Sequence, residues 1–171
     1  NDVDFLVDLA ERYGCRVGFS TLISQAREGR VAADNLLPGG GDLTQALGRI
    51  VKLKQQGKPI LFSAGVYDYA RRWPDPSTNI VMGRAPDFPF IPCFAGRYFC
   101  IVDYNGDLYP CPQLVGILKP KNILRDGFAA AFRHGSEHNC QTCSLPCSNE
   151  FSMFFGLHPS VLWEHFRGYT Y

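Results

Sequence analysis

The stretch FCIVDYNGDLYPC, residues 99–111, decides the fold of the second half of this chain. Its first part, from Phe99 to Tyr104, is mostly aromatic, β-branched or apolar, as in a β-strand. Asn105 and Gly106 then supply two residues that tolerate the positive φ of a type I′ turn. We therefore predict a β-hairpin whose outgoing strand ends at Cys111. Cys93 approaches the other strand, so we expect the thiols of Cys93 and Cys111 to meet near one end of the hairpin.

A second cysteine group follows in the stretch CQTCSLPC, residues 140–147. We expect Cys140 and Cys143 to lie on one tight turn and to complete a four-thiolate site with Cys93 and Cys111. Four convergent thiolates form a soft, closed site that suits zinc or an iron–sulfur cluster. Pro146 favours the first turn of a helix, which predicts that Cys147 is a spare thiol; the alternative is that Cys147 replaces Cys93 as a ligand.

Length and composition limit the class of protein that carries this site and the partners it can bind. The chain has 171 residues, about one domain, and a net charge of +1 with both signs interspersed, so we expect no nucleic-acid partner. No apolar run approaches the roughly 20 residues of a membrane-spanning helix, so we expect no membrane partner either. Seven cysteines, an odd number that includes a CxxC, favour reduced thiols and a metal in the cytoplasm over a secreted disulfide framework. Cys15 and Cys100 are expected to be buried small apolar residues.

The first 73 residues indicate an α/β arrangement. Helical spacing begins at Val3 and is closed by Gly14, and residues 15–20 alternate as in a short strand. Residues 24–41 are expected to form a long loop. Asp42 is then expected to cap a second helix, with Gln45 as its capping-box partner.

The apolar run 60–64 is expected to form a second, buried strand, followed by a short helix at 66–73. This order favours a parallel sheet, in which ligands bind at the carboxyl ends of the strands. Ser20 and Ser63 lie at such ends and are weak candidates for cofactor binding. The alternative is that both hydroxyls bond the local backbone.

Prolines crowd residues 74–92, which we interpret as a linker between two modules. After the hairpin, residues 123–124 and 128–133 suggest a short helix before the CxxC. Residues 151–155 and 161–166 are aromatic-rich at helical spacing, and these aromatics are expected to form core and the dry wall of the cysteine site.

The cysteine module resembles the twitch or SPASM auxiliary-cluster domain of radical S-adenosylmethionine (SAM) enzymes. That family has a Cys, about a dozen residues, a Gly, four residues and a Cys, then a CxxC group, and the matching residues here are Cys93, Gly106, Cys111, Cys140 and Cys143. The resemblance implies three parts. Residues 1–73 would hold the last strands and helices of a partial (β/α) barrel, 74–92 the linker, and 93–171 a small cysteine-rich hairpin-plus-helix module.

The resemblance also implies a function. Five candidate cysteines suffice for one auxiliary [4Fe-4S] cluster, which would relay an electron or position the substrate. The SAM-cleaving motif CxxxCxxC is absent, since Cys140, Cys143 and Cys147 have the reverse spacing. The chain is therefore expected to be the C-terminal portion of a radical SAM enzyme, or a protein that has lost this chemistry. SAM and a second [4Fe-4S] cluster would be bound only by the full-length protein. A peptide or small-molecule substrate and an electron donor such as flavodoxin or ferredoxin are the implied partners.

Two other classes of function stay open. In a zinc-stabilised binding module, His134 or His138 would join Cys140 and Cys143, although solvated histidines on a polar turn are the simpler interpretation. In a thiol redox protein, Cys140 and Cys143 would react as a pair, which requires the CxxC at the N-terminus of a helix.

Overall fold

The computed structural model describes residues 2–22 and 40–167 of the chain, and these form a mixed α/β structure. The described helices are α1 (Asp2–Tyr13), α2 (Gly40–Gln55), α3 (Ala64–Arg71), α4 (Ile123–Asp126), α5 (Phe128–Gly135), α6 (Pro146–Phe155) and α7 (Pro159–Phe166). The strands are β1 (Ile80–Met82), β2 (Ile101–Val102), β3 (Asp107–Tyr109), β4 (Lys121–Asn122) and β5 (Cys140–Cys143), and a 3-10 turn, η2, spans Pro112–Leu114.

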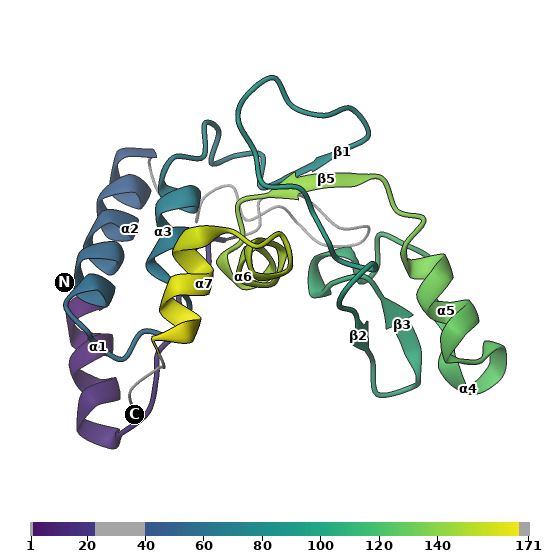
Figure 1. Ribbon diagram of the computed structural model, residues 1–171, viewed down its shortest axis with the longest axis horizontal. Coiled ribbons are helices and arrows are strands. Elements are labelled where there is room, and N and C mark those ends of the chain that lie inside the picture. Colours follow the sequence, from purple (N-terminus) through teal and green to yellow (C-terminus); the bar gives the residue numbers. More distant parts are fainter. Residues whose placement is uncertain (1, 23–39, 168–171) are drawn as a thin grey trace.

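The elements are arranged in two lobes, with a two-stranded ribbon between them near the top of the view (Figure 1). Helices α1, α2, α3 and α7 form the helical lobe, and strands β2 to β4 with α4 and α5 form the hairpin lobe. The β1–β5 ribbon and helix α6 lie between the two lobes. Cys140 and Cys143 lie on β5, and Cys147 lies on α6, in this central region.

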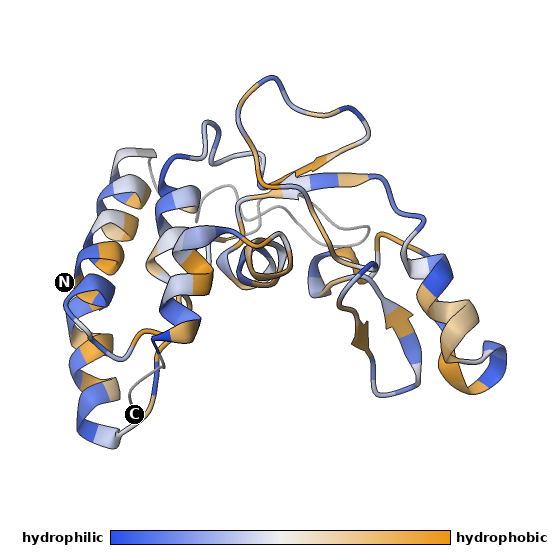
Figure 2. Cartoon of the chain, viewed as in Figure 1, coloured by the Kyte–Doolittle hydropathy of each residue, from blue (hydrophilic) through white to orange (hydrophobic). Residues whose placement is uncertain are grey.

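The main apolar core lies in the helical lobe, where α3 packs against α2, α6 and α7. Orange and blue faces alternate around α1 and α2 in Figure 2, as expected of helices that bury one side. Met153 of α6 and Val161 of α7 belong to the same buried cluster as Val7 and Tyr67. The C-terminal helices therefore share a core with the first 73 residues, and the three-part division of the chain stays a prediction.

Helix α1 and its end at Gly14 were predicted correctly. Gly14 has φ 61°, and the next residue closes the helix with a hydrogen bond from Cys15 N to Ala10 O of 3.0 Å. Helix α2 was predicted to begin at a cap on Asp42, which is wrong because the helix begins at Gly40. Asp42 instead lies in the first turn, where a carboxylate favours the positive end of the helix dipole. Most of the loop predicted at 24–41 lies outside the described residues, and its last two residues are helical.

The two strands predicted at 15–20 and 60–64 are reduced to one parallel bridge between Val17 and Ile60. Val17 N donates to Pro59 O at 3.0 Å, and Leu61 N donates to Val17 O at 2.9 Å. The second strand cannot continue because Ala64 already begins α3. The parallel direction is as predicted, but the described residues contain no barrel, and the partial barrel stays a prediction.

The hairpin is confirmed, with Ile101 opposite Tyr109 and Val102 opposite Leu108. The predicted type I′ turn is wrong, because a positive φ occurs at Gly106, 89°, and not at Asn105. Gly106 N donates to Asp103 O at 2.9 Å, and Asp103 N donates to Asp107 O at 2.8 Å, which makes a three-residue loop of the kind that ends in a glycine bulge. Strand β4 was not predicted; it pairs with β3 on the far side from β2.

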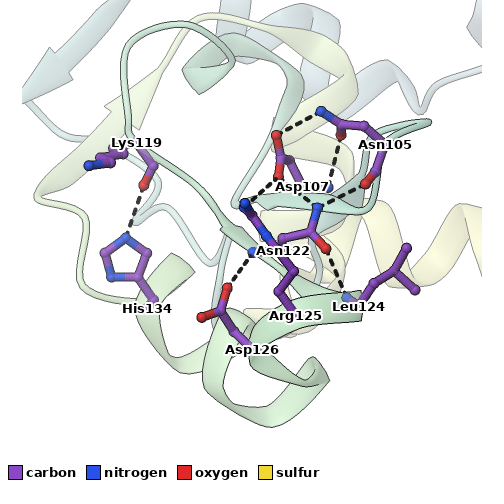
Figure 3. Close-up of polar contacts among 8 residues, drawn as sticks. All are labelled: Asn105, Asp107, Lys119, Asn122, Leu124, Arg125, Asp126 and His134. Atoms are coloured by element: carbon purple, nitrogen blue, oxygen red, sulfur yellow. Dashed lines mark hydrogen bonds and ion pairs between the residues drawn. The ribbon is translucent and has the colours of Figure 1, made fainter.

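Asn122 holds the third strand to the hairpin turn (Figure 3). Its Nδ2 donates to Asn105 O at 2.8 Å and to Asp107 Oδ1 at 3.0 Å, while its Oδ1 accepts from Leu124 N at 2.9 Å and caps α4. Asn122 is buried, so all three bonds are partly shielded from solvent. This one amide therefore fixes the hairpin relative to the helices that follow it.

Helices α6 and α7 form where aromatic spacing predicted helices, but the predicted burial of their aromatics is largely wrong. Phe151, Phe155, Trp163 and Phe166 are 49%, 39%, 60% and 82% exposed. The inner face of α6 is instead polar, since Ser148, Asn149, Glu150 and Ser152 are buried. Because these polar side chains find partners inside, the aromatic side of α6 turns outward.

Candidate metal centre

Five cysteines from three parts of the fold converge in two overlapping apolar clusters. One cluster contains Cys93, Cys111 and Cys140 with Ala95, Phe99, Leu114 and Leu118. The other contains Cys140, Cys143 and Cys147 with Ile80 and Leu145. Cys140 belongs to both clusters and joins the two sequence groups. The predicted meeting of Cys93 and Cys111 with the CxxC is thus seen in the packing.

The prediction that the CxxC lies on a tight turn is wrong. Cys140 and Cys143 lie on strand β5. Cys143 pairs with Ile80, Thr142 with Val81 and Cys140 with Met82, so Gln141 is an extra residue in this ladder. In a regular strand, residues three apart point to opposite faces. A bulge shifts this alternation by one residue, which allows the thiols of Cys140 and Cys143 to face the same cluster.

A second segment is held beside β5 and positions Cys93. Cys93 N donates to Gln141 O at 2.9 Å. His138 strengthens the connection, because its Nε2 lies 2.7 Å from Ala95 O while its Nδ1 accepts from Cys140 N at 3.1 Å. The acceptor role of Nδ1 means that Nε2 carries the proton and donates to Ala95 O.

Both ring nitrogens of His138 are thus occupied by backbone groups. His134 lies 2.9 Å from Lys119 O through Nε2 and 3.2 Å from a Glu137 carboxylate oxygen through Nδ1 (Figure 3 shows the Lys119 contact). Neither histidine offers a free nitrogen to a metal beside Cys140 and Cys143. The simpler interpretation, solvated histidines on a polar turn, is wrong for His138, which is partly buried and bonded to the backbone, and whether either histidine is a ligand stays a prediction.

The thiols interact with one another electrostatically. The Cys140 thiol, as a hydrogen-bond partner, lowers the pKa of Cys93, while Cys93 and then burial raise the pKa of Cys140. Burial raises the pKa of Cys111 to about 11, and burial also raises the pKa of Cys143. Several thiolates in one apolar site are unfavourable without a cation. The site is therefore suited to thiolates only when a positively charged group is shared among them.

Cys147 lies on the first turn of α6, where Pro146 is found as predicted, and it packs in the same apolar cluster as Cys140 and Cys143 of β5. Its Sγ lies 3.9 Å from Ser148 Oγ. Cys147 also contributes to raising the pKa of both Cys111 and Cys143, so it lies near the other thiols. Whether Cys147 is a spare thiol or a ligand stays a prediction.

Within residues 2–22 and 40–167, no three His, Cys, Asp or Glu side chains converge closely enough to hold one metal ion. Thiolates around one zinc ion would lie about 3.8 Å apart, because each Zn–S bond is about 2.3 Å in a tetrahedron. In a [4Fe-4S] cluster each iron takes its own thiolate, so the sulfur donors lie farther apart.

The prediction that the two remaining cysteines, Cys15 and Cys100, are buried is wrong. Cys15 is exposed, because it follows the end of α1 at the surface. Cys100 is half-buried, and partial burial raises its pKa. Neither residue belongs to the two cysteine clusters.

Ser20 and Ser63 have different environments. Ser20 is exposed, and its hydroxyl donates to the neighbouring Thr21 O at 3.4 Å, a local backbone contact. Ser63 is fully buried at the N-cap of α3, and its N and Oγ donate to one carboxylate oxygen of Glu150 at 2.9 and 2.8 Å. The Ser20 hydroxyl therefore bonds the local backbone, whereas Ser63 is engaged with α6.

Sequence reasoning missed two residues that position the site. Glu150 anchors α6, the helix that carries Cys147, to the start of α3. Tyr69 Oη lies 2.9 Å from Oγ1 of Thr142, the residue between Gln141 and Cys143, and accepts from Ile91 N at 3.2 Å. A glutamate in the middle of an aromatic helix was the available signal for Glu150; nothing in the sequence pairs Tyr69 with Thr142.

Comparisons of the chain with models of known families, with curated proteins and with solved structures find no match. None of the helices described is both long enough and apolar enough to cross a membrane.

Proposed function

We propose that this chain binds one [4Fe-4S] cluster through the thiolates of Cys93, Cys111, Cys140 and Cys143. The observation that supports the proposal is the overlap of two cysteine clusters at Cys140, which gathers five thiols from segments up to 54 residues apart in apolar surroundings. Apolar burial excludes water from a cluster and favours its retention.

We further propose that the chain is the auxiliary-cluster portion of a radical SAM enzyme that modifies a peptide or small molecule in the cytoplasm. This part of the proposal rests on the spacing of Cys93, Gly106, Cys111, Cys140 and Cys143. When bound, the cluster supplies a one-electron carrier, and a complete set of four thiolates leaves no open iron for substrate. If three thiolates bind, the open iron would be available to position the substrate. Flavodoxin or ferredoxin is the proposed class of electron donor.

The chain's own residues have three tasks in this function. Gln141, as the bulge in β5, lets Cys140 and Cys143 face one site. His138 holds the Cys93 segment against β5 through two hydrogen bonds. Phe99 packs in the Cys111 cluster, and its ring lies 5.2 Å from that of Phe151 of α6, which joins the cluster to that helix.

The two alternatives are less well supported. A zinc module with a histidine ligand would require His134 or His138 to give up hydrogen bonds that both now make. A thiol redox motif requires the CxxC at a helix N-terminus, whereas Cys140 and Cys143 lie on β5.

Anaerobic reconstitution tests the proposal against zinc. The chain is unfolded under reducing conditions to remove any metal and is then refolded with iron and sulfide. An amount of zinc equal to that of the iron is added afterwards. We expect a brown protein with broad visible absorbance that bleaches on reduction. Stoichiometric zinc with no iron uptake would contradict the proposed cluster. Incubation with SAM and a strong reductant should give no 5′-deoxyadenosine, because the chain lacks CxxxCxxC.

A further inference from the structure

The segment that carries Cys93 and the segment that carries Cys140 are held side by side at two points. Cys93 N donates to Gln141 O at 2.9 Å, and His138 Nε2 donates to Ala95 O at 2.7 Å. The order of these contacts, 93 with 141 and 95 with 138, makes the two segments antiparallel. At the backbone bond between Cys93 and Gln141 the two segments lie at about the 5 Å spacing of paired strands.

The thiols of Cys93 and Cys140 meet between these segments. Both side chains pack in the Cys111 cluster, both are only half-buried, and each is the other's strongest side-chain partner. Cys93 lies opposite Gln141, the neighbour of Cys140, so the Cα atoms of Cys93 and Cys140 are near the separation of about 4.4 to 6.8 Å that a disulfide requires.

The CxxC pair itself does not meet this requirement. Cys140 and Cys143 pair with Met82 and Ile80 at opposite ends of the β1–β5 ribbon. Three steps along an extended strand span about 10 Å, which exceeds the reach of a disulfide unless β5 is disrupted. Cys143 is also buried, whereas Cys93 and Cys140 are accessible to a small oxidant.

We propose that Cys93 and Cys140 form a reversible disulfide when the site holds no metal. In exchange with a small-molecule disulfide such as oxidised glutathione, the Cys93 or Cys140 thiolate attacks one sulfur and releases one glutathione thiol. The second protein thiolate then attacks the mixed disulfide and releases the other glutathione. Two protein thiols lose two protons and two electrons, and one glutathione disulfide becomes two thiols.

The consequence is a site that oxidation closes. The disulfide removes two of the four proposed ligands, so the oxidised chain cannot complete a four-thiolate site. Reduction returns both thiols to positions that β5 and His138 already fix. This inference concerns the same cysteines as the proposed function, but the disulfide depends only on the metal-free fold.

The test uses the full 171-residue chain, freed of metal and equilibrated in glutathione redox buffers. Free thiols are alkylated, and linked peptides are mapped by mass spectrometry without reduction. We expect one intramolecular link between Cys93 and Cys140 that dithiothreitol removes. A link within Cys140–Cys143, a link from Cys93 to Cys147, or glutathione adducts alone would overturn the inference.

Single-serine variants localise the link, because Cys140, Cys143 and Cys147 lie close together in sequence. The link should be lost in Cys93→Ser and Cys140→Ser and kept in the matched variants Cys143→Ser and Cys147→Ser. Iron binding by the reduced chain is measured separately. A chain that forms this disulfide but binds no iron contradicts only the proposed function, and a chain that binds iron but forms another link contradicts only this inference.

Discussion

The carboxylate of Glu150 accepts two hydrogen bonds from Ser63, 2.9 Å from the backbone N and 2.8 Å from Oγ, and both residues are buried. The pair joins the start of α3 to the middle of α6. His165 Nε2 lies 3.6 Å from the other carboxylate oxygen. A buried acid at a helix N-terminus satisfies donors that the helix itself cannot use. The pair therefore fixes the cysteine-bearing helix to the helical lobe.

Replacement of Glu150 by Ala should lower the free energy of unfolding by about 2–4 kcal/mol, since two buried donors on Ser63 would lose a charged partner. Glu150→Gln should cost less, because the amide oxygen still accepts. Chemical denaturation measures both changes. Glu137→Ala, whose side chain is 65% exposed, is the control and should stay within about 0.5 kcal/mol of the native chain. Equal effects of the Glu150 and Glu137 replacements would show that the Ser63 bonds contribute nothing.

Asn122→Asp should destabilise the hairpin lobe by about 2–3 kcal/mol, because two donated bonds are lost and a second carboxylate is placed near Asp107. Asn122→Ala adds no carboxylate, but it removes the cap on Leu124 N as well as the two donated bonds, so it should cost a similar amount. Asn139→Asp makes the same chemical change at an exposed position and should be nearly neutral. Denaturant unfolding would contradict this account if Asn122→Asp were as stable as Asn139→Asp.

Glu164 gives the stability a dependence on pH. Burial raises its pKa above the ordinary value of 4.5, although Ala64 N and Lys54 counteract this; Glu150 and His165 also face it. A raised carboxyl pKa contributes stability below the unfolded pKa that is lost as pH rises through the folded pKa. The stability of the native chain relative to Glu164→Gln should therefore fall from about pH 4 to pH 6. A relative stability that rises over this range would contradict the assigned shift.

How much of this structure the sequence predicts depends on the range of the interactions involved. The periodicity of residues 3–13 and the Asn105-Gly106 pair act locally, so α1 and the hairpin were predicted correctly. The bulge at Gln141 and the third strand β4 depend on partners far away in the chain, and no local pattern encodes them.

The aromatics of α6 show the same limit in packing. Their spacing indicated a helix but not which face is buried, and buried Glu150 and Asn149 reversed the expected orientation. Asn149 Nδ2 donates to Cys143 O at 2.7 Å, a contact between helix and strand that only the tertiary fold creates. For the site, the cysteine spacing predicted which thiols meet, whereas the roles of His138 and Glu150 required the structure.

The ligand set is tested by changing each cysteine of the site to Ala and measuring iron per chain after anaerobic reconstitution. Loss is expected for Cys93, Cys111, Cys140 and Cys143, because an incomplete thiolate set leaves a cluster labile. Iron should be retained in Cys147→Ala. Retention in Cys93→Ala together with loss in Cys147→Ala would move the ligand set toward the C-terminus.

The most direct test of the central claim is the content of iron and acid-labile sulfide in three reconstituted proteins. These are the native chain, Cys111→Ala and Cys100→Ala. Cys111→Ala removes a buried thiol of the cysteine site, and Cys100→Ala removes a half-buried thiol outside both apolar clusters. We predict about four irons and four sulfides per chain in the native protein and in Cys100→Ala, and a large loss of both in Cys111→Ala. Equal iron in Cys111→Ala and Cys100→Ala, or zinc without sulfide in the native chain, would contradict a [4Fe-4S] cluster at this site.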